Sequence, residues 1–500
     1  MTSGESRSFA APDLGQKERR QGVRIGVVGI GYVGLVTSAC LAEWGHTVVG
    51  LDVDDQRLLS LAQGRMPFHE PGLEALVASN SSTGRLQFSS RIADLVEGAE
   101  LVFVAVGTHD GNGGWQTETV RACLAAVVPK LDDDTTLVIR STLPPDFIRG
   151  LPSLVQAFRD EAGRPPIALL LNPEFTREGS AIRDFMDPER VVIGVADDPT
   201  GNGEESLKRL YGAARAPILV LSAMDAAFAK LGSNLFLATK ISFANELARL
   251  CDAFGANVER VVSAMAYDSR IGGAFLRPGV GFGGSCLPHQ LAMTVRDARV
   301  TGMEPALLEA VDQINRRQSP RLVELLTELC GGALDGRRIA LLGLAFKPNT
   351  DDIRAAPSLT VASLLIERGA RVVAYDPMPQ ARERAVALLP QIEMAQTLRE
   401  AVTGADAAAL VTEWREFVEA DWASLRLQMR AGLFVDGRNA LSPERMARDG
   451  FHYASFGRPR DGAQGAFPTT TEDAFRTLAT TAGNSHDGLV GATALTGAPP

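Results

Sequence analysis

Two residue types that often mark function are scarce in this 500-residue chain. It contains 5 cysteines and 6 histidines. No two cysteines have C-x-x-C spacing and the histidines form no ligand pattern, so we expect no metal site. No apolar run reaches the roughly 20 residues that a membrane-spanning helix needs. Residues 1–21 lack the apolar core of a signal peptide, which predicts a cytoplasmic protein with reduced thiols.

The chain also lacks an excess of positive charge. Its 50 Lys and Arg residues face 60 Asp and Glu residues, giving a net charge of -10. This balance argues against nucleic acid or an anionic membrane as the main partner. Hydrophobic residues make up 45% of the chain, as in ordinary soluble proteins. The composition therefore predicts a soluble protein, and the length predicts two or three domains.

The first motif is a glycine-rich turn between a predicted strand over 24–29 and an apolar helix. A second predicted strand over 47–52 ends on Asp52. This order is typical of dinucleotide binding, because the glycines let a pyrophosphate meet the helix N-terminus and the acid binds the ribose. Asp54 and Asp55 would repel a 2′-phosphate, which favours NAD over NADP. The residues of the turn are Gly29, Ile30, Gly31, Tyr32, Val33 and Gly34.

Polar residues follow three further predicted strands of the same sheet. Strands over 101–106, 135–139 and 167–171 are followed by Thr108, Thr142 and Glu174, respectively. Ligands of doubly wound sheets bind at the carboxyl ends of the strands. We therefore expect these three side chains to converge on one crevice. Two more strands of this domain are predicted over 190–195 and 217–221.

A long helical pattern then covers residues 223–255. At 1.5 Å per residue it would span roughly 50 Å, which suits a bridge between domains or the core of a dimer. Lys230 and Asn234 are four residues apart and share one face of this helix. A lysine that packs its stem and exposes its head would explain Lys230 alone, but the pairing with Asn234 favours a functional lysine.

A second α/β unit follows a further predicted helix over 305–330. Its predicted strands cover residues 337–344, 371–376, 407–411 and 433–436. The turn after its first strand lacks the full glycine fingerprint. A nucleotide could therefore bind there, but the dinucleotide signal is absent.

One cysteine of the five lies in a glycine loop. Four glycines precede Cys286 in the segment 279–290, and Pro288 suits the first turn of a helix predicted over 291–299. Cys286 is thus placed just before a helix N-terminus, whose dipole lowers a thiol pKa and suits a nucleophile. The alternative is a small residue in a tight turn, which resembles the structural role expected of the other four cysteines.

Together these motifs resemble the UDP-glucose/GDP-mannose dehydrogenase family over about residues 23–458. The resemblance implies an α/β fold with two Rossmann-like doubly wound domains joined by a long central helix. The segments that carry it, besides the glycine turn, are Asn172-Pro-Glu-Phe-Thr-Arg-Glu-Gly-Ser180, Lys230-Leu-Gly-Ser-Asn234, Gly281-Phe-Gly-Gly-Ser-Cys286 and Phe346-Lys-Pro-Asn-Thr-Asp-Asp-Ile-Arg354.

The resemblance divides the chain into five parts. Disordered tails are predicted at both ends, because the end segments are polar or rich in small residues. The predicted parts are a tail over 1–21, an NAD-binding Rossmann domain over 22–222, a central helical domain with the cysteine loop over 223–320, a UDP-sugar-binding Rossmann-like domain over 321–460, and a tail over 461–500.

Members of this family oxidise the C6 alcohol of a nucleotide sugar to a carboxylate in two steps with NAD. The resemblance implies that Cys286 attacks the intermediate aldehyde, that a second oxidation gives a thioester, and that water releases the acid. The expected substrate is UDP-glucose, whose product UDP-glucuronate feeds polysaccharide synthesis, and GDP-mannose is the alternative. A homodimer through the central helix is also implied.

The resemblance assigns roles to individual residues. Lys230 and Asn234 match a pair that stabilises oxyanion charge. Glu174 matches a carboxylate linked to base catalysis in thioester hydrolysis, and Thr142 matches a threonine that positions water. In the family, Arg270 comes from the neighbouring subunit. Besides the glycine turn, the implied cofactor positions are Asp52, Arg57, Thr108, Thr142, Glu178 and Arg354. The implied substrate positions are Glu174, Phe175, Arg177, Glu178, Lys230, Asn234, Arg270, Phe275, Arg277, Gly283, Phe346, Lys347 and Arg438.

One departure from the family bears on catalysis. The family has an aspartate where this chain has Gln290, and an amide can hydrogen-bond but cannot act as a base or carry charge. Two hypotheses remain open: an active dehydrogenase that tolerates glutamine, and a paralogue that binds both ligands with weak or no turnover. A single-step hydroxy-acid dehydrogenase is disfavoured by Cys286 and by the second α/β domain.

Overall fold

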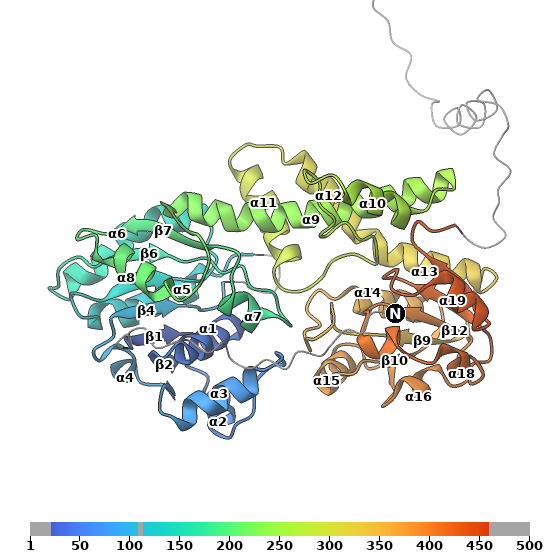
Figure 1. Cartoon of the computed structure of the whole chain (residues 1–500), viewed down its shortest axis with the longest axis horizontal. Helices are drawn as coiled ribbons and strands as arrows, with labels where there is room; N and C mark the ends of the chain where they lie inside the picture. The colour runs from blue at the N-terminus through green and yellow to red at the C-terminus, as the bar shows by residue number, and fades with distance from the viewer. Residues whose placement is uncertain (1–21, 109–113, 460–500) are drawn as a thin grey trace, which may run out of the picture.

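The computed structural model describes residues 22–108 and 114–459 (Figure 1). The two predicted tails, 1–21 and 461–500, lie outside the described residues. Two α/β lobes lie side by side, and a long helix, α9 (Ala223–Phe254), runs from the first lobe toward the second (Figure 1). Within the described ranges, no helix combines the length and apolar character needed to cross a membrane.

The first lobe is built on an eight-stranded sheet with the strand order β3-β2-β1-β4-β5-β6-β7-β8. Every neighbouring pair is parallel except β6 and β7, which run antiparallel. The central strands are apolar and buried, as strands covered on both faces by helices must be. The strands are β1 (Arg24–Val28), β2 (Thr47–Leu51), β3 (Leu86–Ser89), β4 (Leu101–Val104), β5 (Thr136–Ile139), β6 (Leu169–Leu171), β7 (Val191–Asp197) and β8 (Ile218–Ser222).

Helices cover the faces of this first sheet. They are α1 (Tyr32–Glu43), α2 (Asp55–Ala62), α3 (Leu73–Ser82), α4 (Ile92–Val96), α5 (Thr117–Val127), the 3₁₀ turn η1 (Val128–Lys130), α6 (Pro145–Glu161), α7 (Ala181–Met186) and α8 (Asn202–Tyr211).

The central helices correct one prediction. The single helix expected over 305–330 is two helices that meet at Arg317. The long helix α9 has the predicted length, with Ser222 capping its N-terminus and Gly255 ending it at a φ of 71°. Glycine suits this left-handed end because it has no Cβ. The other central helices are α10 (Val258–Ala266), α11 (Leu287–Val300), α12 (Ala306–Arg316) and α13 (Gln318–Leu329).

The second lobe contains a six-stranded, all-parallel sheet with the order β11-β10-β9-β12-β13-β14. Two such sheets confirm the predicted fold class. The strands are β9 (Arg338–Leu342), β10 (Arg371–Tyr375), β11 (Glu393–Met394), β12 (Ala407–Leu410), β13 (Leu433–Asp436) and β14 (His452–Ser455). The helices are α14 (Pro357–Glu367), α15 (Pro379–Leu388), α16 (Leu398–Val402), α17 (Arg415–Val418), α18 (Trp422–Arg426) and α19 (Pro443–Arg448).

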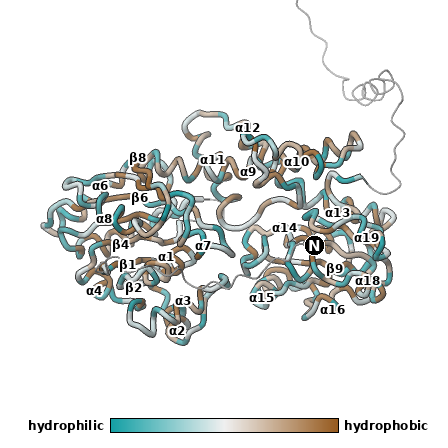
Figure 2. The backbone as a smooth tube through the Cα atoms, viewed as in Figure 1, coloured by the Kyte–Doolittle hydropathy of each residue, from teal (hydrophilic) through white to brown (hydrophobic). Residues whose placement is uncertain are grey.

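The apolar cores lie within the two lobes. Hydrophobic segments follow the strands at the centre of each lobe, and hydrophilic segments lie mainly on loops and outer helices (Figure 2). Separate groups of buried residues pack on the two faces of each sheet. Each lobe therefore buries its own core, and other contacts join the lobes.

A loop after β9, residues 345–356, joins the lobes; we call it the bridging loop. The carboxylate of its Asp351 accepts a hydrogen bond of 3.0 Å from the backbone N–H of His69 in the first lobe. The carbonyl of its Arg354 accepts a hydrogen bond of 2.9 Å from the N–H of Gly284 in the cysteine loop. The bridging loop thus holds the first lobe and the cysteine loop against the second lobe.

Candidate functional site

The glycine-rich turn links β1 to the N-terminus of α1. Gly29 adopts a φ of 88°, and a Cβ at this position would lie 2.8 Å from the carbonyl oxygen of Ala105. A Cβ on Gly34 would overlap the carbonyl oxygen of Gly29, so the helix and the turn pack too closely for a side chain. Gly31 differs, because a Cβ there meets nothing within 4 Å. This open space at a helix N-terminus, with its unpaired N–H groups, fits the pyrophosphate of a dinucleotide.

Asp52 follows β2 and holds the same turn. Its carboxylate accepts hydrogen bonds from the backbone N–H groups of Ile30 at 2.8 Å and Asp54 at 3.0 Å. Arg57 lies 2.7 Å from the carboxylate of Asp52 and 3.4 Å from that of Asp54. Two carboxylates thus neutralise one guanidinium, and the surplus negative charge beside the turn disfavours a 2′-phosphate. The arrangement fits NAD better than NADP.

Sequence reasoning missed Glu70, a buried carboxylate beside the turn. It accepts hydrogen bonds from the Tyr32 hydroxyl and from the backbone N–H groups of Gly179 at 2.6 Å and Ala181 at 2.8 Å. Burial and the charge of Glu70 raise the pKa of Tyr32. Glu70 therefore ties the cofactor turn to the segment 172–180. A lone acid in a loop carries no sequence signal that could have revealed this role.

A buried ion pair lies where α9 meets the end of β6. Lys230 is 4% exposed, and its ammonium lies 2.9 Å from a carboxylate oxygen of Glu174. The other oxygen of Glu174 accepts two hydrogen bonds of 2.8 Å from Thr176. Burial raises the pKa of Glu174, but the charge of Lys230 and these hydrogen bonds outweigh it and lower the pKa overall. Thr142 lines a small pocket together with Lys230.

The residue that departs from the family contacts the same helix. Gln290, on α11, is 2% exposed, and its side-chain oxygen accepts a hydrogen bond of 2.8 Å from the amide of Asn234. Asn234 lies one helical turn beyond Lys230. Each residue of the Lys230 and Asn234 pair is therefore held by its own partner: Glu174 holds Lys230, and Gln290 holds Asn234.

Cys286 is the N-cap residue of α11, as predicted, but its pKa corrects the sequence interpretation. Although the residue as a whole is exposed, loss of hydration around the thiol raises its pKa, and the nearby carboxylate of Glu174 adds to the rise. The charge of Lys230 and a contact of 3.7 Å with the Ser285 hydroxyl oppose this effect only in part. The pKa of Cys286 is therefore raised overall, whereas its position before a helix N-terminus predicts a lowered pKa.

Glu178 provides a second carboxylate near the thiol. It lies 3.4 Å from the Ser285 hydroxyl and 3.4 Å from the guanidinium of Arg354, which is also paired with Asp352 at 2.7 Å. Burial and the charge of Asp352 raise the pKa of Glu178 to about 7. Burial lowers the pKa of the neighbouring Lys347. Two ionisable groups with shifted pKa values thus lie beside the thiol, as is common in active sites.

Several predicted substrate positions meet where the second lobe packs against the cysteine loop. Arg438 donates hydrogen bonds to the carbonyls of Gly281 at 3.3 Å and Phe346 at 2.8 Å. A Cβ on Gly283 would overlap the carbonyl oxygen of Ala355. Only glycine fits this approach of the cysteine loop to the bridging loop.

Three predicted arginines are exposed to solvent in this single chain. Arg177 pairs with Asp184 at 2.7 Å, and Arg270 pairs with Asp268 at 2.6 Å. The side chain of Arg270 is 87% exposed, and Arg277 is exposed as well. The guanidinium groups of these three arginines therefore remain accessible to a ligand or a second subunit.

Three further predicted positions are Phe175, Thr108 and Phe275. The ring of Phe175 lies 5.4 Å from the ammonium of Lys230 and 4.0 Å from the guanidinium of Arg190. Thr108 is buried after β4. Phe275 adopts a φ of 64°, which is strained for a bulky residue. Such strain is frequent near functional sites.

Known proteins resemble this chain over nearly its whole described length. Three domain profiles of the UDP-glucose/GDP-mannose dehydrogenase family match: the NAD binding domain over 23–215, the central domain over 224–317 and the UDP binding domain over 340–443. The UDP-glucose 6-dehydrogenase of Pseudomonas aeruginosa is 40% identical, with 88% of this chain and 98% of that protein covered. The UDP-glucose 6-dehydrogenase of Rhizobium meliloti is 37% identical, with 87% and 100% covered.

A solved structure is similar as well. The UDP-glucose dehydrogenase of Pyrobaculum islandicum has a TM-score of 0.79 and 36% identity, with 88% of this chain and 99% of that chain covered.

The glycine turn generates a test with a matched pair of variants. Gly31→Ala should fold normally but bind NAD at least about tenfold more weakly, because the methyl group enters the open space at the helix N-terminus. Gly34→Ala should instead lose thermal stability, because its Cβ overlaps the backbone. Thermal unfolding and titration with NAD measure both effects. Unchanged NAD affinity in Gly31→Ala would contradict the assignment.

Proposed function

Because this chain belongs to the UDP-glucose/GDP-mannose dehydrogenase family, we propose that it oxidises the C6 alcohol of UDP-glucose to the carboxylate of UDP-glucuronate. The observation that carries the proposal is Cys286 at the start of α11, beside the Lys230–Glu174 pair. The names of the curated relatives support UDP-glucose over GDP-mannose. The family resemblance and the use of NAD, both predicted from the sequence, are confirmed.

We assign NAD to residues 22–222, the catalytic helices to 223–320 and the nucleotide sugar to 321–460, with family matches at similar positions in support. NAD⁺, when bound, takes up one hydride in each of the two oxidations. Gly31 and the N-terminus of α1 receive its pyrophosphate, and Asp52 receives a ribose. We also place the protein in the cytoplasm, where its five free cysteines stay reduced.

The thiol of Cys286 is protonated at neutral pH, because its pKa is raised, so it needs a base before it can attack the aldehyde. Ser285 lies between the thiol and Glu178. We assign the proton to Glu178, whose pKa of about 7 suits an acceptor at neutral pH. Glu174 is the weaker acceptor, because Lys230 lowers its pKa.

The anionic oxygen that forms on C6 when Cys286 attacks needs donors. The ammonium of Lys230 has three N–H groups, and the contact with Glu174 leaves others for the oxyanion. Asn234, held by Gln290, provides an oriented amide beside it. After the second oxidation the thioester is cleaved by a water molecule, which Thr142 positions and Glu174 polarises.

The aspartate that Gln290 replaces is therefore not the only source of base chemistry. Glu174 and Glu178 both remain near Cys286, and Gln290 keeps a positioning contact with Asn234. This arrangement supports the active enzyme over the binding-competent paralogue.

The function is tested by counting NADH and acid formed from UDP-glucose, with GDP-mannose as a parallel substrate. We expect two NADH and one UDP-glucuronate per UDP-glucose, because an alcohol loses four electrons on becoming a carboxylate. Cys286→Ser should bind UDP-glucose but release no acid. Binding of both ligands without NADH, or normal acid formation by Cys286→Ser, would refute the proposal.

The role of Glu178 predicts a pH dependence. A base with a pKa of about 7 carries a proton below that pH, so kcat/KM should fall as the pH drops through 7. Glu178→Gln should lower kcat roughly 10²-fold or more and remove this acidic limb. Glu174→Gln is the matched control and should keep the limb near pH 7. If kcat/KM of Glu178→Gln still falls as the pH drops through 7, a group other than Glu178 takes the proton from Cys286.

We further propose that two chains pair along α9. Phe236, Phe243 and Leu250 are spaced by seven residues, which places them on one helix face, and they are 65%, 49% and 50% exposed. Phe254 extends the row and is also exposed. Such a contiguous apolar stripe is typical of an interface. In this dimer the exposed Arg270 reaches the partner's substrate.

Mixing inactive variants tests this dimer. If Arg270 acts across the interface, Cys286→Ser and Arg270→Ala chains, unfolded and refolded together, form mixed dimers with one intact site. Equal mixing should then restore about a quarter of wild-type activity, because half of the dimers are mixed. Cys286→Ser mixed with Lys230→Ala is the control and should restore none, because both residues act within one chain. No recovery in the first mixture would mean that Arg270 acts in its own subunit or not at all.

A further inference from the structure

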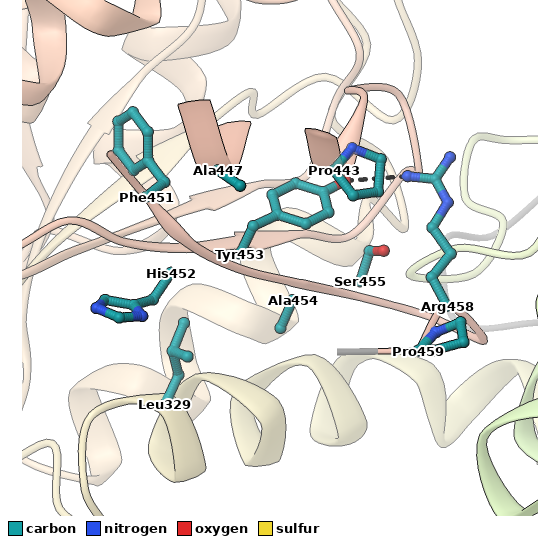
Figure 3. A pocket seen from close by; sticks show the side chains of 10 residues that line it. All are labelled: Leu329, Pro443, Ala447, Phe451, His452, Tyr453, Ala454, Ser455, Arg458 and Pro459. Carbon is teal, nitrogen blue, oxygen red and sulfur yellow. Dashed lines mark hydrogen bonds between the residues drawn. The ribbon is translucent and has the colours of Figure 1, made fainter. Parts of the chain in front are cut away.

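Two buried polar side chains, Arg458 and Glu70, each hold several segments of the chain together. In the second lobe, Arg458 donates hydrogen bonds to the Tyr453 hydroxyl at 3.1 Å and to the carbonyl of Leu441 at 2.9 Å, beside a cavity of about 180 Å³ (Figure 3). These contacts stay within that lobe. The cluster around Glu70 is different, because its partners belong to the cofactor turn and to the segment that carries Glu178.

Glu70 is surrounded by hydrogen-bond donors. Its side chain is 4% exposed. One carboxylate oxygen accepts hydrogen bonds from the Tyr32 hydroxyl and from the N–H of Gly179 at 2.6 Å, and the other oxygen accepts one from the N–H of Ala181 at 2.8 Å. A carboxylate has only acceptor sites, so the ionised side chain of Glu70 satisfies all three donors.

The two backbone donors lie close to Glu178 in the chain. Gly179 follows Glu178 directly, and Ala181 is the first residue of α7. Gly179 also packs against the bridging loop, because a Cβ at this position would lie 3.0 Å from the carbonyl oxygen of Asn349. The backbone that follows Glu178 is therefore held between Glu70 of the first lobe and the bridging loop of the second.

The side chain of Glu178 extends from this backbone toward the cysteine loop. Its carboxylate lies 3.4 Å from the Ser285 hydroxyl, 3.5 Å from the Thr350 hydroxyl and 3.4 Å from the guanidinium of Arg354. Hydrogen bonds of such lengths are weak. The shorter bonds that Glu70 makes to the neighbouring backbone therefore provide the firmer hold on the position of Glu178.

Tyr32 connects the same carboxylate to the cofactor turn. It is the first residue of α1 and follows Gly31. Its ring lies 4.7 Å from the ring of Phe68, two residues before Glu70. Burial and the carboxylate of Glu70 raise the pKa of Tyr32, so the hydroxyl keeps its proton and donates it to Glu70 in a hydrogen bond. A shift of the turn is therefore transmitted to the backbone beside Glu178 through one side chain.

We infer that Glu70 is a positioning residue that holds Glu178 where it can take the proton of Cys286, and that Tyr32 ties this position to the turn that receives NAD. The inference rests on the proposed role of Glu178 as the base. Glu70 acts through backbone N–H groups, so it needs no contact with the substrate. The seat of the cofactor and the base that prepares the nucleophile thus share one carboxylate.

A double-mutant cycle tests whether Glu70 acts through Glu178. Glu70→Gln keeps the size of the side chain, but in either orientation its amide turns an NH₂ group toward one of the two backbone donors. It should lower kcat about tenfold in the wild-type background and less than about twofold in the Glu178→Gln background. Asp198→Asn is the matched control, because Asp198 also accepts backbone N–H bonds, at the start of α8. It should leave kcat unchanged in both backgrounds.

Alkylation of Cys286 by iodoacetamide, without ligands and followed by mass spectrometry, gives a readout that needs no turnover. The charge of Glu178 raises the pKa of Cys286, so Glu178→Gln should react faster at a pH of about 8. Glu70→Gln should react faster as well, and the double variant no faster than Glu178→Gln. Tyr32→Phe removes only a hydroxyl and should change the rate in the same direction as Glu70→Gln.

Two results would overturn the inference: an unchanged kcat in Glu70→Gln, or a loss of kcat that persists in the Glu178→Gln background. If Glu70→Gln fails to fold, Tyr32→Phe decides, and an alkylation rate equal to that of the wild type would refute the link. Failure of the proposed function shows separately, as a wild-type protein that forms no NADH from UDP-glucose. The alkylation cycle then still decides whether Glu70 positions Glu178.

Discussion

The burial of the Lys230 ammonium constrains the rest of the site. A buried charge is tolerated only when it is paired and hydrogen-bonded, so α9 can approach the first sheet only where Glu174 follows β6. This fixes the long helix against the first lobe, and the same helix face then presents Asn234 to Gln290. Because Gln290 lies one turn after Cys286, the ion pair also determines where the thiol lies.

The two lobes use the same strand–turn–helix unit in opposite ways. In the first lobe, Asp52 leaves the turn open above Gly31. In the second, Asp376 accepts hydrogen bonds from the backbone of Leu344 and Ala345 and from the Trp414 indole. The equivalent acid is thus fully occupied inside its own lobe. The turn in the first lobe therefore has room for a dinucleotide, whereas the turn in the second lobe is held closed by Asp376 and leads into the bridging loop.

Local patterns in the sequence revealed most of the fold. The strands of both sheets that carry continuous apolar runs were predicted within about two residues, and so was α9, because its caps at Ser222 and Gly255 bound a long periodic segment. The short strands β3, β11 and β14 were missed, since two to four mixed residues give no period. The antiparallel direction of β7 was also missed, because strand direction depends on the connection and not on the strand's own residues.

The sequence indicated which residues form the candidate site but not the pKa values of their ionisable side chains. Motifs placed Cys286 at a helix start, and the structure agrees. Its pKa and that of Glu178 depend on neighbours 100 or more residues away, such as Glu174 and Asp352, which no local pattern connects. Glu70 escaped for the same reason, because its partners come together only in the folded chain.

The raised pKa of Cys286 also protects the protein. Peroxides and disulfides react with the thiolate, so a cysteine is oxidised more readily when its pKa is lowered. Here the raised pKa of Cys286 favours the protonated thiol although the residue is exposed. The same burial that raises the pKa of Cys286 therefore slows the oxidation of its thiol.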